Sequence, residues 1–153
     1  MFSKEEAYQK KKDFWVSYGG YMKLQKNAEG ESINWINYKT GVKGLYFRTN
    51  VDRKFAEVLI QVDHPDPDMK QMIWEQLEEY ELVLHSYIGD NWIWTKNDFD
   101  EDGKEISTIR IKLDDVSIFR DADWPNILTF LKERIKNLDE FWVDHKESFE
   151  IFK

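Results

Sequence analysis

Three parts of the chain carry apolar residues at helical spacing, and the parts between them have the patterns of strands. The helical stripes cover residues 4–25, 66–88 and 121–147. A stripe with a period of 3.6 residues buries one face of a helix, whereas alternation or a short β-rich run is typical of a strand. The β-like segments are residues 33–38, 45–49, 55–63, 91–95, 105–113 and 116–119.

These patterns predict an α+β fold of one domain, residues 1–153. The elements follow the order α-βββ-α-ββ(β)-α, so we expect three helices packed on a mainly antiparallel sheet of five to six strands. The chain shows no linker and no low-complexity tract, and 153 residues are too few for two ordinary domains. Ser3 with Glu6, and Asp66 before Pro67, predict where the first two helices begin.

Aromatic residues are unusually frequent, with 7 Trp, 7 Tyr and 10 Phe, and cysteine is absent. Each aromatic side chain buries about 150–250 Å², so the core is bulky and needs no disulfide or metal to support it. Two interpretations stay open. The aromatic residues fill a dense core, or some of them form a surface patch that contacts another protein.

The charge balance disfavours polyanions as general partners. Lys and Arg number 22 against 30 Asp and Glu, for a net charge of −8. No run of apolar residues is long enough to cross a membrane, and the first residues do not resemble a signal peptide. Together with the absence of cysteine, this predicts a cytoplasmic protein without a membrane partner.

Residues 39–54 carry a local charge of +4, with aromatic residues among the basic ones. Basic groups beside aromatic rings are typical of surfaces that bind single-stranded nucleic acid or phosphorylated ligands. The alternative is a solvated hairpin whose lysines protect the strand edges from pairing. The candidate binding residues are Lys39, Lys43, Tyr46, Arg48, Arg53 and Lys54.

Two acidic clusters are candidates for binding a metal ion. Asp98, Asp100 and Asp102 match the start of a calcium loop, but its twelfth position is not the required glutamate. The alternative is a solvated hairpin turn. Asp63 and His64 lie where a strand meets a helix, and carboxylate and imidazole are both metal ligands.

No catalytic or cofactor motif is present, so we expect a protein that is not an enzyme and has no cofactor. The order αβββαβ is also that of the core of restriction-endonuclease-like folds. Those enzymes need an acid on the second strand and an acid-x-Lys pair on the third. Here Leu59 stands where the lysine is required, so the likeness is chance or marks an inactive relative.

Four segments together resemble a bacterial family defined only as a domain of unknown function. They are INWINYKTG (residues 33–41), LYFR (45–48), DWP (123–125) and DEFW (139–142). Similar domains occur alone or C-terminal to nuclease-like domains. The resemblance implies an accessory role beside enzymes of DNA processing or defence, and it implies no catalytic residues.

The leading prediction is therefore a non-enzymatic binding or accessory domain that contacts a protein partner or associates with itself. The alternative is nucleic-acid binding through the hairpin of residues 39–54. A third hypothesis is a metal-dependent hydrolase that uses Asp63 and His64 or the loop 98–102.

Overall fold

The computed structural model describes residues 2–153, and within them it has four α-helices and one four-stranded sheet. The chain runs through the elements in this order: α1 (Lys4–Met22), β1 (Leu45–Val51), β2 (Phe55–Val62), α2 (Pro67–Glu79), α3 (Glu81–Ile88), β3 (Ile93–Phe99), β4 (Glu105–Asp114), η1 (Asp121–Asp123), α4 (Trp124–His145) and η2 (Lys146–Phe152), the two η elements being 3₁₀-helices.

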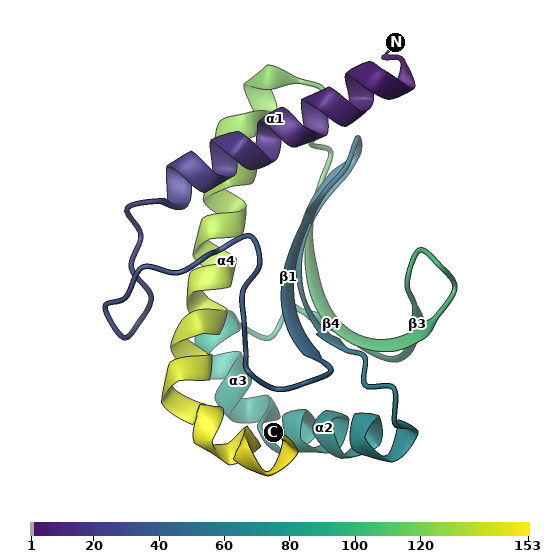
Figure 1. Cartoon of the computed structure of the whole chain (residues 1–153), viewed down its shortest axis with the longest axis vertical. Coiled ribbons are helices and arrows are strands. Elements are labelled where there is room, and N and C mark those ends of the chain that lie inside the picture. Colours follow the sequence, from purple (N-terminus) through teal and green to yellow (C-terminus); the bar gives the residue numbers. More distant parts are fainter. Residues whose placement is uncertain (1) are drawn as a thin grey trace.

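The sheet has the order β1-β2-β4-β3, and every neighbouring pair is antiparallel. The helices lie on one side of the strands, and the sheet curves so that its other side is concave (Figure 1). We call these the inner face and the outer face. Along β2 the inner face carries Ala56, Val58, Ile60 and Val62, all fully buried.

The α+β class and the antiparallel sheet agree with the sequence analysis, but the prediction of five to six strands and three helices is wrong. Residues 33–38 form no strand. The Asn34 side-chain oxygen accepts the backbone N–H groups of Ile36 (3.0 Å) and Asn37 (3.1 Å), so the backbone turns there. Such local bonds replace those of a sheet ladder. Residues 116–119 also lie outside the sheet.

The predicted helix over residues 66–88 is two helices, because the chain bends at Tyr80. Tyr80 leaves helical geometry at φ −92° and ψ 11°. Its ring packs against Phe141 and Phe149, and its hydroxyl shares a hydrogen bond with Ser148. These tertiary contacts place the side chain toward α4 and η2, and the helix axis changes direction to allow them.

The likeness to restriction-endonuclease-like folds is also wrong for this chain. Only two strands, β1 and β2, separate α1 from α2, and the sheet is antiparallel throughout. The αβββαβ order on which that comparison depended is therefore absent from the structure of residues 2–153.

The predicted helix starts are confirmed by their hydrogen bonds. The Ser3 hydroxyl accepts the Glu6 N–H at 3.1 Å, and the Glu6 carboxylate accepts the Ser3 N–H at 3.2 Å. Asp66 caps α2 by accepting the N–H of Asp68 at 2.9 Å, and Pro67 occupies the first turn. Local capping chemistry therefore places both helix ends.

Most of the aromatic residues belong to the core, which favours the dense-core interpretation for the majority of them. All seven Trp side chains are buried or half-buried. Within residues 2–153 the exposed aromatic side chains are Phe2, Tyr8, Tyr21 and Phe99. A general surplus of aromatic surface is therefore absent, and any apolar docking surface must be found locally.

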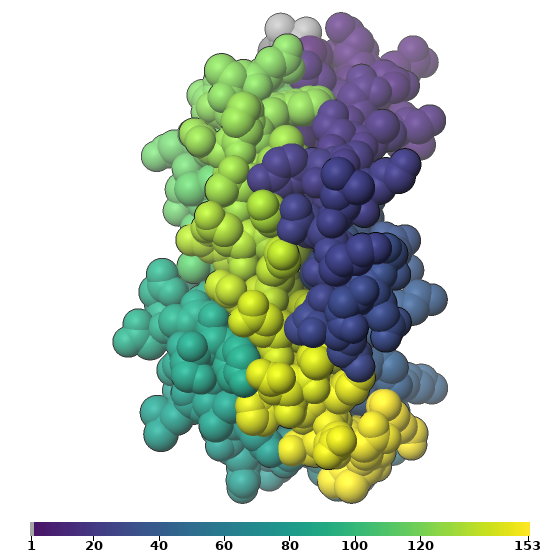
Figure 2. Space-filling model, turned by 90° about the vertical axis from the view of Figure 1, so that its left-hand side faces the viewer, coloured from purple at the N-terminus to yellow at the C-terminus, as the bar shows by residue number. Residues whose placement is uncertain are grey.

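Helix α4 spans the length of the helical layer, and the long loop of residues 23–44 lies beside its C-terminal half (Figure 2). Asp139 of α4 is 1% exposed and holds this loop through two hydrogen bonds. It accepts the Tyr38 hydroxyl at 2.6 Å and the Ala28 N–H at 2.7 Å. No helix of residues 2–153 is long and apolar enough to span a membrane.

Candidate binding surfaces

A hollow of about 570 Å³ lies along the exposed side of α1, and most of its lining is apolar. We call it the α1 groove. It is lined by Tyr8, Lys11, Lys12, Trp15, Val16, Gly19, Gly20 and Ile36. Except for Ile36, these residues repeat along α1 at positions i, i+3 and i+4, which places them on one side of the helix.

The α1 groove exposes large apolar side chains on the side of the helix that does not face the core. Phe14, Tyr18 and Met22 are the buried residues of α1. Tyr8 is 72% exposed, Val16 is 69% exposed, and Ile36 from the following loop is 43% exposed. The predicted stripe of this helix therefore combines core residues with surface residues such as Tyr8.

Two features give the α1 groove its shape and charge. Ile36 lies beside Gly19, since its Cδ1 atom would be at an ordinary contact distance of 3.7 Å from a Cβ added there. Lys11 and Lys12 stand on the rim and form no ion pair with residues 2–153. Their neighbour Lys10 differs, because it pairs with Asp121.

The outer face of the sheet carries a part-buried polar network centred on Arg110. Its two guanidinium nitrogens donate to Glu57 and to Asp98, each at 2.8 Å. Glu57 is only 5% exposed and also accepts from Asn50 at 3.0 Å. Thr108 donates to Asp98 at 2.7 Å. Because every charge is paired, the network supports the concave sheet rather than presenting a free reactive group.

The environment of Asp98 has opposing effects on its acidity. Burial raises the pKa of Asp98, but hydrogen bonds from Thr108 and the Phe99 N–H, with the charge of Arg110, outweigh it. The net result is a pKa below the usual value for aspartate. Asp98 is therefore an ionised partner of Arg110.

Two cation–ring pairs stand on the same outer face. The Arg48 guanidinium lies 4.3 Å from the ring centre of Tyr46, and the Lys112 ammonium lies 4.4 Å from that of Phe55. Arg48 and Lys112 are exposed, while the rings are half-buried. Two of the predicted nucleic-acid residues are thus brought together, and Lys112 joins them from β4.

The other predicted basic residues do not join that surface. Lys43 lies in the turn before β1, while Arg53 and Lys54 lie in the turn after it, so the length of β1 separates them. Lys39 lines a separate cavity of about 420 Å³ between the loop 23–44 and the end of α4. The basic segment 39–54 is therefore divided among at least three places.

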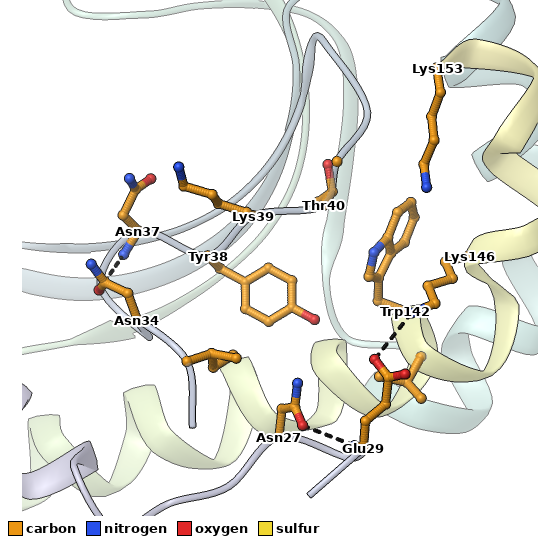
Figure 3. Close-up of a pocket in the computed structure, with 13 residues that line it drawn as sticks. Asn27, Glu29, Asn34, Asn37, Tyr38, Lys39, Thr40, Trp142, Lys146 and Lys153 are labelled. Atoms are coloured by element: carbon orange, nitrogen blue, oxygen red, sulfur yellow. Dashed lines mark hydrogen bonds and ion pairs between the residues drawn. The ribbon is translucent and has the colours of Figure 1, made fainter. Parts of the chain in front are cut away.

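The cavity that Lys39 lines is bounded by aromatic rings, amides and lysines (Figure 3). Trp142 and Tyr38 form its inner side, and burial together with the bond to Asp139 raises the pKa of Tyr38 above its usual value. The rim lysines Lys146 and Lys153 are paired with Glu29 and Glu150. Sequence reasoning missed Asp139, although its place four residues after Ile135 and three before Trp142, on the apolar stripe, was a signal.

Asp63 and His64, predicted as metal ligands, lie at the end of β2 and take part in other interactions. Asp63 forms an ion pair with Lys104 at 2.7 Å. The hydrogen bond to Asp63, followed by the charge of Asp63, raises the pKa of Lys104. The His64 Nδ1 atom accepts the Asp66 N–H at 2.9 Å.

The acidic loop forms a tight turn. The Asp100 side chain accepts the N–H groups of Asp102 and Lys104, each at 2.9 Å, and Gly103 has φ +79°. Among residues 2–153 no three His, Asp or Glu side chains are grouped so that they could hold a metal ion. The metal hypothesis for Asp63, His64, Asp98, Asp100 and Asp102 thus gains no support from this geometry.

Comparison with known proteins assigns the chain to a family. Residues 10–146 match the family described as Domain of unknown function (DUF4268), and this range is most of the chain. No curated protein and no solved structure matches it. The chain therefore belongs to the DUF4268 family, as the resemblance to a domain of unknown function predicted, while the bacterial origin and the nuclease-like neighbours stay predictions.

Proposed function

We propose that this member of the DUF4268 family is a non-enzymatic binding domain, and that its α1 groove docks an apolar segment of a partner protein. The observation that carries the proposal is the exposure of Tyr8, Val16 and Ile36 around one hollow. Isolated apolar residues are normal on a protein surface, but a contiguous apolar hollow is typical of an interaction site.

The rim of the α1 groove supports a partner segment that combines apolar and acidic side chains. Lys11 and Lys12 flank the apolar lining without intramolecular ion pairs among the described residues. A carboxylate on the partner would be attracted to them, which favours one orientation of the segment. The resemblance to domains beside nuclease-like domains favours a partner from bacterial DNA processing.

The test places a photo-crosslinking amino acid at position 16 and, as a matched control, at position 82. Leu82 of α3 is 84% exposed and lies outside the α1 groove. We expect a discrete adduct from position 16 in cells, no such adduct from position 82, and loss of the adduct in Ile36→Glu. An identical adduct from both positions, or none from position 16, would overturn the proposal.

A second candidate function is binding of single-stranded nucleic acid on the outer face of the sheet. The observation that favours it is the pair of cation–ring contacts at Arg48–Tyr46 and Lys112–Phe55. Exposed cations attract phosphates, and the guanidinium plane of Arg48 offers a surface on which a base can stack.

Fluorescence anisotropy with a labelled single-stranded oligonucleotide tests this second function. We expect Arg48→Glu to weaken binding by about tenfold or more, and affinity to fall steeply as salt rises. Lys132→Glu is the control, because it reverses a charge on α4, on the helical side of the sheet. Equal binding by both variants, or no binding at low salt, would remove this candidate.

A further inference from the structure

A third cavity, of about 410 Å³, lies where α2 meets the ends of β3 and β4. It is distinct from the α1 groove and from the outer face of the sheet. Its lining includes His64 from the turn after β2, Lys70 and Trp74 from α2, Lys96 from β3, and Lys104 before β4. A volume of this size is in the range of small-ligand sites.

The charge around this cavity is unbalanced. Lys70, Lys96 and Lys104 converge on it, and Glu105 is the only acidic residue in its lining. Lys104 is paired with Asp63, but neither Lys70 nor Lys96 has a carboxylate partner among residues 2–153. Like charges brought together repel one another, and an anion between them relieves this repulsion.

His64 adds a hydrogen-bond donor to the lining, and Trp74 forms part of its wall. Trp74 is 3% exposed, and its indole N–H is buried without a hydrogen-bond partner. Because that atom is closed off from solvent, it is the ring of Trp74, not its N–H, that lines the cavity. Because His64 Nδ1 accepts the Asp66 N–H, the neutral imidazole carries its own proton on Nε2, which leaves a donor at that atom.

The backbone holds His64 in place through Gly44. A Cβ atom added at Gly44 would lie 2.7 Å from the His64 Cβ, and Gly44 has φ +82°. The Asp63 N–H also donates to the Gly44 carbonyl at 2.7 Å. This wall of the cavity is therefore preorganised, which lowers the cost of binding a ligand.

We propose that this cavity binds the terminal phosphate of a phosphate monoester, held by Lys70, Lys96 and the Nε2–H group of His64. Phosphate offers several strong acceptor oxygens and two negative charges, and so matches a lining of ammonium groups and an N–H donor. The cavity leaves room for part of the esterified group. The ester is a free phosphorylated metabolite or the 5′-phosphate end of a nucleic-acid strand, and these sources share the same chemistry.

Two-dimensional ¹H–¹⁵N NMR tests the proposal through the seven Trp indole N–H signals. Trp74→Phe assigns the signal of Trp74. We expect inorganic phosphate and ribose 5-phosphate to shift that signal more than the other six, because Trp74 lines the cavity. Each probe is added to about 10 mM, a concentration that nearly saturates a site with a millimolar Kd. Lys70→Gln with Lys96→Gln replaces side chains of the cavity lining, and it should weaken binding by about tenfold or more. Lys132→Gln on α4 should not.

Oligonucleotides then distinguish the two sources of the phosphate. A 5′-phosphorylated strand that shifts the Trp74 signal at lower concentration than ribose 5-phosphate identifies a strand end, whereas the reverse order identifies a metabolite. The shift should survive Arg48→Glu, so failure of the outer-face function leaves this result intact. An unchanged Trp74 signal with every probe, or equal binding by the double lysine variant, would overturn the proposal.

Discussion

Replacing Tyr38 with phenylalanine removes one hydroxyl and leaves a buried carboxylate short of a partner. Tyr38 donates to Asp139 at 2.6 Å, and Asp139 is 1% exposed, so water cannot take the place of the hydroxyl. A hydrogen bond to a charged group contributes about 1.5–3 kcal/mol to stability. The ring itself keeps its packing against Phe47, since phenylalanine preserves it.

We expect Tyr38→Phe to lower the free energy of unfolding by about 2 kcal/mol. For a chain of this length that loss corresponds to a fall in Tm of roughly 4–8 °C. Urea unfolding followed by tryptophan fluorescence measures it. Tyr8→Phe is the matched control, because Tyr8 is 72% exposed, and it should change stability by less than about 0.5 kcal/mol.

The double variant Tyr38→Phe with Asp139→Ala separates the Tyr38–Asp139 hydrogen bond from the other interactions of the two residues. Asp139 also accepts the Ala28 N–H, so Asp139→Ala removes two bonds and should cost more than Tyr38→Phe. The two losses should not add, and the shortfall is the coupling between the residues. Asp139 would not anchor this loop if Tyr38→Phe were as stable as Tyr8→Phe. The same conclusion would follow if the losses of the two single variants added fully in the double variant.

Three further predictions concern the turn before β1 and the outer face of the sheet. Gly44→Ala should destabilise the protein by about 2 kcal/mol or more, and Gly30→Ala by about 1 kcal/mol. Both glycines have positive φ, but only Gly44 has a close neighbour where a Cβ would be added. Urea unfolding of both variants measures the two losses. Arg110→Leu should cost about 3–5 kcal/mol in the same assay, since it leaves the buried Glu57 charge unpaired, and Arg110→Leu with Glu57→Leu should recover much of it. The pKa of Asp98 is lower in the folded protein than in the unfolded chain, so its ionised form stabilises the fold above the pKa of the unfolded chain. Stability should therefore fall as the pH drops below about 4. In thermal melts across pH, Asp98→Asn should lack the part of this fall that Asp98 causes.

Sequence patterns predicted best where local periodicity and burial agree. The alternation of residues 55–63 corresponds to β2, whose inner side chains all face the core. The stripe of residues 121–147 corresponds to α4, and Asp66 and Ser3 cap their helices as predicted. The helix caps depend on neighbours within four residues, and the strand and α4 show their buried faces directly as a periodic pattern, so a pattern in the sequence is sufficient.

Prediction failed where side-chain hydrogen bonds and packing, many of them to distant residues, outweigh the preference of the segment. Residues 33–38 are β-rich, but Trp35 donates to the Gln25 carbonyl at 3.0 Å and Tyr38 donates to Asp139, so both side chains are anchored away from the sheet. The bend at Tyr80 has the same cause. Its contacts with Phe141 and Phe149 lie more than sixty residues along the chain.

The candidate sites show the same division. Tyr46 and Arg48 were predicted from the basic and aromatic composition of residues 39–54, and they meet because residues two apart on a strand share a face. Lys39, Lys43 and Arg53 were grouped because they are close in sequence. In the structure the first two precede β1 and the third follows it, so the length of the strand lies between them. His64 was chosen as a metal ligand, whereas the structure surrounds it with lysines from α2, β3 and the turn before β4.

The sequence by itself therefore determined the class of the fold, the helix starts, the central strands and the family, because these depend on residue types and short-range order. Only the tertiary structure decided which exposed side chains gather. The α1 groove joins Val16 to Ile36 across a loop, and the lysine-lined cavity joins Lys70 to Lys96 and Lys104. Such groupings depend on how the chain packs over long sequence distances, and no local pattern records that packing.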